Sequence, residues 1–264
     1  MRFDKLIPNF ITLLNLFSGI MAMLFALLGD MSLCFMFVVI GLVFDFLDGF
    51  IARLLNARSH IGKELDSLAD LITFGLVPGI VMFHLIYWSE SSAKFGYGFF
   101  HFYLENATEE NGFDILLKLP MLGFIITLAS AYRLARFNAD NRQTNYFLGL
   151  ATPGNAIFIL SLPMIIDEYG RDFLGGLLLN TPFLIFITFF SAFLMNAPIR
   201  LFSLKTTRYG FKDNYLRYIF VLTAVFGFFT IGYLIIPLSL VLYFLISRLF
   251  AFQLGLKELD EILS

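Results

Sequence analysis

Charged residues are scarce in this chain: Asp, Glu, Lys and Arg make up only 14% of its 264 residues. Soluble proteins carry roughly 25% charged residues, so this composition excludes an ordinary soluble domain. The 18 basic and 20 acidic side chains leave a net charge of −2, which offers no attraction for nucleic acid. Hydrophobic residues reach 59% and include 35 Phe. We therefore expect a polytopic membrane protein that forms a single domain over residues 1–264.

Cysteine is nearly absent, since Cys34 is the single one in the sequence. One thiol cannot form a disulfide within the chain, and its place in an apolar run indicates a packed side chain. A clear small-residue cleavage site is also lacking after the first apolar stretch. We interpret that stretch as a retained membrane span and not as a signal peptide.

Long apolar runs predict the membrane spans, each of which needs about 20 residues. We expect an all-α bundle of about eight transmembrane helices, with a six-helix catalytic core and accessory spans within 214–251. The fifth run is short and the last two are hardly separated, so seven spans is the alternative. The predicted spans are 9–28, 32–54, 65–88, 116–137, 152–167, 173–196, 214–232 and 234–251.

Lys and Arg predict the orientation. With eight spans and the N-terminus inside, only Lys94, Lys118 and Arg171 of the 18 Lys and Arg residues fall on the outer side. Cytoplasmic loops of membrane proteins carry such an excess of positive charge. We therefore expect both termini to be cytoplasmic, in the inner (plasma) membrane of a prokaryotic cell.

Four aspartates interrupt the apolar runs between residues 45 and 70. Asp45 and Asp48 are three residues apart and Asp66 and Asp70 are four apart, so each pair shares one face of a helix. An ionised Asp at the bilayer centre costs about 2.5–3.5 kcal/mol, so four of them need compensation. One or two hard divalent cations, Mg²⁺ or Mn²⁺, would supply it and leave room for a phosphate group. Helix capping, or pairing with nearby basic side chains, is the alternative.

A longer pattern surrounds these aspartates: D-x2-D-G-x2-A-R-x8-G-x3-D-x3-D, from Asp45 to Asp70. It resembles, without departure, the signature of the CDP-alcohol phosphatidyltransferases, which are integral membrane enzymes of phospholipid synthesis. The resemblance implies that the four aspartates bind a pair of metal ions and that Asp70 is also the catalytic base. It further implies that three residues of this stretch contact the CDP group: Gly49, Arg53 and Ser59.

Small and polar residues nearby extend the candidate CDP-diacylglycerol site. Ala52 continues the helix face of Asp45, and Gly62 completes the pattern; helix packing is the alternative for both. Asn9 and Thr12 lie at the predicted cytoplasmic mouth of the first span, with a plain membrane anchor as the alternative. The string Pro-Asn-x-x-Thr-x-x-Asn that begins at Pro8 resembles the start of the phosphatidylserine synthase branch of the family.

A basic stretch, Tyr-Arg-Leu-Ala-Arg-Phe-Asn, ends the fourth predicted span. Its Arg133 and Arg136 share a helix face and suit bidentate binding of a carboxylate or phosphate; positive-inside anchoring is the alternative. The stretch resembles the Arg-Leu-Ala-Arg-Phe-Asn of the same branch. So does the later Phe-x-Gly-Leu segment, except that Ala151 stands where the branch usually has Pro. Lys205 is a further candidate for an anionic group, with surface charge as its alternative.

The branch resemblance implies transfer of a phosphatidyl group from CDP-diacylglycerol to L-serine, with release of CMP, by metal-assisted attack of the serine hydroxyl. It also implies a homodimer whose substrate acyl chains extend into the membrane lipids. The nearest alternative is another acceptor, such as glycerol 3-phosphate or an inositol phosphate. A cation transporter that uses the aspartates, or a structural scaffold, are alternatives of other classes. Pro78, shortly after the motif, is expected to kink the third span. A wider cavity beside Asp70 and ordinary bundle shape are equal alternatives for the purpose of that kink.

Overall fold

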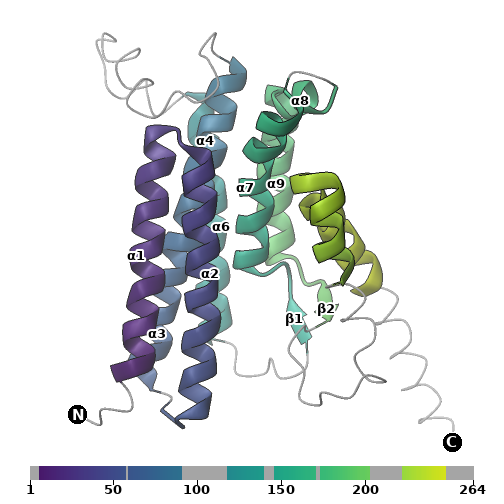
Figure 1. The fold of residues 1–264 in the computed structure, drawn as a ribbon. Coiled ribbons are helices and arrows are strands. Elements are labelled where there is room, and N and C mark those ends of the chain that lie inside the picture. Colours follow the sequence, from purple (N-terminus) through teal and green to yellow (C-terminus); the bar gives the residue numbers. More distant parts are fainter. Residues whose placement is uncertain are drawn as a thin grey trace, which may run out of the picture.

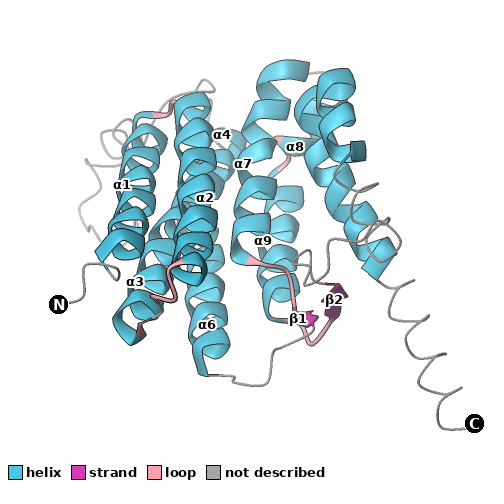
Figure 2. Ribbon diagram, turned by 60° about the horizontal axis from the view of Figure 1, so that its bottom comes forward, coloured by secondary structure: helices cyan, strands magenta, loops and turns pink. Residues whose placement is uncertain are grey.

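The computed structural model describes residues 6–57, 59–90, 118–139, 146–170, 173–202 and 222–247. Its helices run up and down as a bundle (Figures 1 and 2). The first two helices are antiparallel neighbours: α1 (Leu6–Leu28) and α2 (Met31–Leu54). Between them, Gly29 has a φ of 85° and Asp30 caps α2 by accepting a hydrogen bond from the Leu33 N–H at 2.9 Å. A glycine in the left-handed region and a capping Asp are what a two-residue reversal needs.

The third long helix changes its hydrogen-bond pattern part way. α3 (His60–Asp70) continues into a π-helix, η2 (Leu71–Leu76), and then into α4 (Val77–Glu90). Pro78, in the first turn of α4, has no N–H to donate to the preceding turn. The kink expected from Pro78 stays a prediction. The structure shows a π-helical turn directly after Asp70, and such turns are frequent at functional sites.

The second half of the bundle begins with a 3-10 turn, η4 (Leu119–Phe124), which leads into α6 (Ile125–Ala139). Three helices follow: α7 (Thr152–Tyr169), α8 (Phe173–Leu178) and α9 (Thr181–Asn196). The prediction of one continuous helix over 173–196 is wrong, because the chain breaks between α8 and α9. Asn180 starts α9 there by accepting a hydrogen bond from the Phe183 N–H at 3.1 Å.

Two short strands, not predicted from the sequence, join the ends of α7 and α9. β1 (Tyr146–Leu148) precedes α7 and pairs antiparallel with β2 (Arg200–Phe202), which follows α9. Gly149, directly after β1, has a φ of 73°, and its N–H donates to the Ile199 carbonyl oxygen at 2.9 Å. A Cβ on Gly149 would overlap the Met195 carbonyl oxygen, so only glycine fits.

The last described segment folds back on itself. Residues 222–231 and 235–247 are helical, and the 3-10 turn η5 (Gly232–Leu234) separates them. Gly232 has a φ of 57°, and a Cβ on Gly227 would overlap the side chain of Ile235 eight residues later. The reversal falls between the seventh and eighth predicted spans, whose outer parts lie outside the described residues.

Four of the described helices are long and apolar enough to cross a membrane, which makes this a polytopic membrane protein by length and composition: Leu6–Leu28, Met31–Leu54, His60–Glu90 and Leu222–Ser247. The last of them has the length of one span, but the bend at Gly232 divides it into two shorter helices. Thr181–Asn196 is a further, shorter apolar helix. The count of eight spans stays a prediction.

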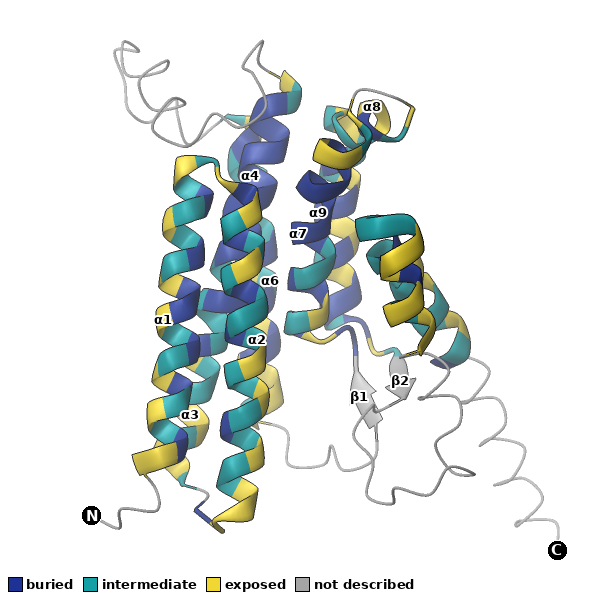
Figure 3. Cartoon of the chain, viewed as in Figure 1, coloured by how far each residue is buried: buried dark blue, intermediate teal, exposed yellow. Residues whose placement is uncertain are grey.

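Burial distinguishes an inner from an outer layer of helices. α4 is buried along nearly its whole length and α7 along most of it (Figure 3). α1 and α2, in contrast, expose large apolar side chains such as Phe10, Phe17 and Phe46. A continuous apolar surface of this kind is unfavourable in water and suits contact with lipid.

One end of the bundle collects the start of α1, the connection between α2 and α3, and both strands (Figure 1). We refer to it as the strand end. Arg53 in the last turn of α2, Lys63 in the first turn of α3 and Arg136 in the last turn of α6 belong to helix ends that reach it. Among the described side chains, Lys118, directly before η4, is the basic residue at the opposite end. The predicted asymmetry of positive charge is therefore present along the bundle axis. Which side of a membrane the strand end faces stays a prediction.

Candidate active site

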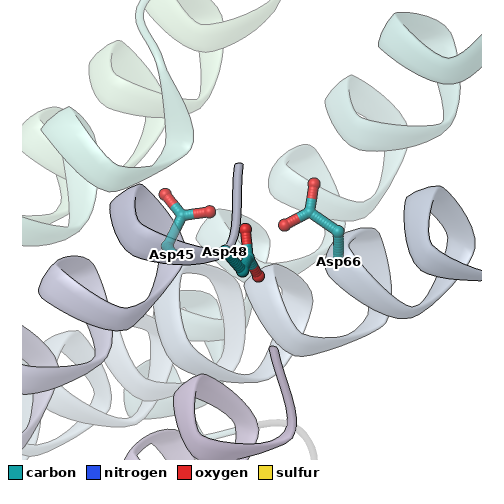
Figure 4. A group of neighbouring side chains, drawn as sticks. All are labelled: Asp45, Asp48 and Asp66. Carbon is teal, nitrogen blue, oxygen red and sulfur yellow. The ribbon is translucent and has the colours of Figure 1, made fainter. Parts of the chain in front are cut away.

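Three carboxylates from two helices point toward one another (Figure 4). α2 supplies Asp45 and Asp48, and α3 supplies Asp66. One oxygen from each lies within 4.8 Å of the others. Asp48 is buried, with 5% of its surface exposed, and the other two are half-buried. Three ionised carboxylates this close repel one another strongly away from water, so the cluster is suited to a bound cation.

The donor set of this cluster fits a hard divalent ion. Two oxygens on opposite sides of an octahedral Mg²⁺ lie about 4 Å apart, because each Mg–O bond is about 2.1 Å long. Oxygens already within 4.8 Å need only small side-chain rotations to reach that separation. The three-residue set contains carboxylates alone, whereas zinc sites usually include His or Cys.

α1 contacts the cluster from the side. Thr12 is buried, and its hydroxyl donates a hydrogen bond to Asp48 Oδ2 at 2.5 Å. Thr12 Oγ1 also lies 3.1 Å from the carbonyl oxygen of Pro8. A hydroxyl has one proton, and a carboxylate is the stronger acceptor. The Thr12 hydroxyl thus contacts a carboxylate of the cluster, and the part predicted for Thr12 in nucleotide binding stays a prediction.

Asp70 lies beside this cluster with a different partner. Its Oδ1 accepts a hydrogen bond from Asn15 Nδ2 of α1 at 3.3 Å. The three clustered carboxylates and the Arg133 guanidinium are close enough to act on it electrostatically. The structure thus brings three of the four predicted metal ligands within 4.8 Å of one another and leaves the fourth adjacent to them.

The small residues of the motif have distinct surroundings. A Cβ on Gly49 would meet no described atom within 4 Å, so the surface above Gly49 is open to a ligand. A Cβ on Gly62 would lie 2.9 Å from Asn9 Oδ1 and 3.0 Å from Ser59 Oγ. The start of α3 therefore packs closely on α1 at Gly62. Ser59 Oγ accepts a hydrogen bond from the Gly62 N–H at 3.0 Å and so caps α3.

The remaining candidates for nucleotide and anion binding are partly accessible. Arg53 is exposed in the last turn of α2, where a cation also interacts favourably with the helix dipole. Ala52, the preceding residue, is half-buried. Lys205 lies outside the described residues.

The two arginines of α6 have different neighbours. Arg133 is 9% exposed, lies in electrostatic range of Asp70 and Tyr243, and its Nε makes no hydrogen bond among the described residues. Arg136 is exposed, and its Nη1 donates to the Asn196 carbonyl oxygen at 3.3 Å. Arg133 therefore points toward the bundle interior beside the aspartates, while Arg136 contacts the end of α9.

Three polar contacts around the aspartates were not predicted. Asn138 Nδ2 donates to Ser67 Oγ at 2.8 Å, and Lys63 Nζ donates to the Asn138 carbonyl oxygen at 3.0 Å, which ties α3 to the end of α6. The contact of Asn15 with Asp70 is the third. Asn15 had a signal in the sequence, because a polar residue on one face of an apolar span is usually functional. The partners of Asn138 had none, since they depend on how distant segments pack.

The chain matches a family sequence model and is similar to several known proteins. A sequence model described as CDP-alcohol phosphatidyltransferase matches residues 5–196 of the chain. The chain is similar to three proteins named CDP-diacylglycerol–serine O-phosphatidyltransferase. The Saccharomyces cerevisiae protein is 32% identical over 194 residues, which cover 67% of this chain and 58% of that protein. The Helicobacter pylori protein is 30% identical over 225 residues, 84% of this chain and 79% of that protein. The Bacillus subtilis protein is 30% identical over 161 residues, 59% of this chain and 75% of that protein.

Proposed function

Since this chain belongs to the CDP-alcohol phosphatidyltransferase family, we propose that it transfers a phosphatidyl group from CDP-diacylglycerol to L-serine and releases CMP. The observation that carries this proposal is the cluster of three carboxylate oxygens within 4.8 Å, formed by residues of the family pattern. The names of the relatives, at 30% and 32% identity, support serine as the acceptor alcohol.

The aspartates are the ligands for Mg²⁺ or Mn²⁺. Asp45, Asp48 and Asp66 would hold the metal, and Asp70, beside them, would complete a site for two ions. Bound there, the ions would supply positive charge for the pyrophosphate oxygens of CDP-diacylglycerol and for the departing CMP. The chain contributes the preset separation of the carboxylates and, through Thr12, the orientation of Asp48.

Asp70 is the base for the acceptor alcohol. It takes the proton of the serine hydroxyl, and the serine oxygen forms a bond to the lipid-bearing phosphorus. In line with that attack, the bond from this phosphorus to the CMP oxygen breaks and CMP leaves. The separate partner of Asp70, which is Asn15 and not a member of the carboxylate cluster, supports this role.

Substrate binding is shared among the side chains around the aspartates. Arg133, which is buried next to Asp70, binds the serine carboxylate, and Arg136 with Lys205 attracts anionic groups toward the pocket. Acyl chains leave sideways into the membrane lipids. The cytidine diphosphate group is held by residues from α1, α2 and the start of α3: Asn9, Thr12, Gly49, Ala52, Arg53, Ser59 and Gly62.

The proposed architecture is one membrane domain of eight spans, in which the six-helix core carries the site and the spans within 214–251 are accessory. The end of the family match at residue 196 supports that division. The basic residues at the strand end support a cytoplasmic position for both termini and for the site. We place the protein in the inner membrane of a prokaryotic cell as a homodimer.

The test is CMP release by the purified protein from CDP-diacylglycerol with L-serine, glycerol 3-phosphate or an inositol phosphate, each with Mn²⁺ and with EDTA. We expect release with serine that depends on the metal. Release with another alcohol and not with serine would correct the acceptor. No release with any alcohol, together with cation flux in proteoliposomes, would replace the enzyme by a transporter.

A further inference from the structure

Asn15 has a buried amide side chain to which the proposed chemistry assigns no role of its own. It lies on the inner face of α1 and is 0% exposed, in a helix that is otherwise almost entirely apolar. Its Nδ2 donates to Asp70 Oδ1 at 3.3 Å, and its Oδ1 has no hydrogen-bond partner among the described residues. The orientation of the amide follows from the carboxylate, because an ionised Asp70 accepts hydrogen bonds and donates none.

Stability alone does not account for this residue. Hydrogen bonds between side chains of membrane helices contribute little on average, because the unfolded helices also find partners in the membrane. A buried acceptor without a partner destabilises the folded protein by more than such a hydrogen bond stabilises it. An apolar side chain at position 15 would avoid that cost, so the amide must serve another purpose.

The backbone around Asn15 is held tightly. The carbonyl oxygen of Asn15 accepts a hydrogen bond from Thr73 Oγ1 of the π-helix at 3.2 Å. A Cβ on Gly19 of α1 or on Gly41 of α2 would overlap Thr73, so the three helices are in close contact at this level. Asn15 therefore has little freedom to move, and its amide stays next to the last residue of α3.

On the basis of the proposed function, we propose that Asn15 is a positioning residue for Asp70. By holding Oδ1 it directs the other carboxylate oxygen of Asp70 to the hydroxyl of the acceptor alcohol. Thr12, on the same face of α1, holds Asp48 in the corresponding way for the metal site. One helix thus orients two carboxylates with two separate tasks.

The test is Asn15→Leu, which removes the donor and keeps the number and branching of the side-chain heavy atoms. A small error in the position of a reacting group can lower the rate about 100-fold, and we expect a loss of that order in kcat. The KM for serine, the KM for CDP-diacylglycerol and the affinity for Mn²⁺, titrated by electron paramagnetic resonance, should each stay within about threefold of wild type. A role in structure alone would not separate kcat from these other quantities.

Ser18→Ala is the matched control, because Ser18 is a buried polar residue on the same face of α1 with 3% exposure. Its kcat should stay within about threefold of wild type. If Asn15→Leu does not insert into membranes, Asn15→Ala replaces it, with the same expected loss in kcat.

Three results would overturn the inference. The first is an Asn15 variant whose kcat lies within about threefold of an active wild-type protein. The second is a loss of Mn²⁺ affinity that matches the loss in kcat, which would assign Asn15 to the metal site. The third is a wild-type protein that releases no CMP with any alcohol, which defeats the proposed function and this inference together.

Discussion

At the scale of single residues, the candidate site separates side chains that would bind metal from those that orient them. Asp48 is the most enclosed of the clustered carboxylates, and it is also the one that receives the Thr12 hydroxyl. Asp70 receives the Asn15 amide instead. Both donors come from α1, whose inner face is a row of small and polar residues in an apolar helix.

Replacing the carboxylates of Asp66 and Asp70 by amides tests the roles proposed for them, which are metal binding and proton transfer. An Asn side chain keeps the shape but neither balances a cation nor takes a proton. We expect Asp66→Asn and Asp70→Asn each to lower CMP release roughly 10²- to 10⁴-fold. Affinity for Mn²⁺ should fall more in Asp66→Asn, because Asp66 belongs to the three-oxygen cluster. Unchanged CMP release with a normal gel-filtration profile in either variant would contradict the assigned role.

Thr12→Val tests the support of Asp48. Valine has the shape of threonine without the hydroxyl, and removing a hydrogen bond to a metal-binding group typically weakens metal affinity about 10- to 100-fold. The measurement is a Mn²⁺ titration of the purified protein. Thr188→Val is the control, since buried Thr188 donates to the Leu184 carbonyl oxygen at 2.8 Å, four residues back, with no carboxylate involved. Equal metal affinities for the two variants would count against a role of Thr12.

The sequence was enough to predict that the aspartates pair, but not which side chains donate hydrogen bonds to them. Helical periodicity within a segment puts Asp45 and Asp48 on one face, so their pairing follows from local geometry. The contacts of Thr12 and Asn15 depend on which face of α1 packs against α2 and α3, which is set by tertiary packing. For the same reason, the common face of Arg133 and Arg136 did not predict that they contact different neighbours.

At the scale of elements, apolar run lengths predicted the long helices and missed the places where polar or backbone details interrupt them. The predicted spans 9–28 and 32–54 correspond to Leu6–Leu28 and Met31–Leu54. The break before α9 arises from the capping by Asn180, which hydropathy does not register. The pairing of β1 with β2 was invisible because strands of three residues leave no periodic pattern.

Gly149→Ala tests the junction of these strands with α9. An alanine there would adopt an unfavourable positive φ, which costs roughly 1–3 kcal/mol, and its Cβ would also overlap the Met195 carbonyl oxygen. We expect a lower unfolding temperature of the detergent-solubilised protein. Gly154→Ala is the control, because Gly154 lies within helix α7 and a Cβ there would approach only Leu150 Cδ1, at 3.5 Å. Similar stability of the two variants would refute the tight junction.

At the scale of the whole molecule, the arrangement of the helices accounts for the charge asymmetry. Helices that alternate in direction return to the strand end after α2, α6 and α9 (Figure 1), and the first two of these returns carry Arg53 and Arg136. The aspartate cluster lies toward the same end. A nucleotide-activated lipid would therefore be met by metal-binding groups and by cationic side chains from one side.

Labelling with a membrane-impermeant maleimide tests this orientation. Ser32 and His60 are exposed at opposite ends of the bundle, and Cys34 is 0% exposed, so the background should be low. In right-side-out membrane vesicles, we expect labelling of Ser32→Cys and labelling of His60→Cys only after detergent is added. Wild-type protein controls for Cys34. The reverse order of labelling would place the aspartates on the outer side.

The π-helical turn over Leu71–Leu76 carries a consequence for the angular phase of the third helix. A π-turn holds one residue more than an α-turn, so removing one residue here would rotate everything beyond it by about 100° relative to α3. Gly75 and Gly79, whose missing side chains admit Ser130 and Thr127 of α6, would then turn away from that helix. The additional residue of the π-turn therefore lets one continuous helix direct its aspartates toward the candidate site and its glycines toward α6.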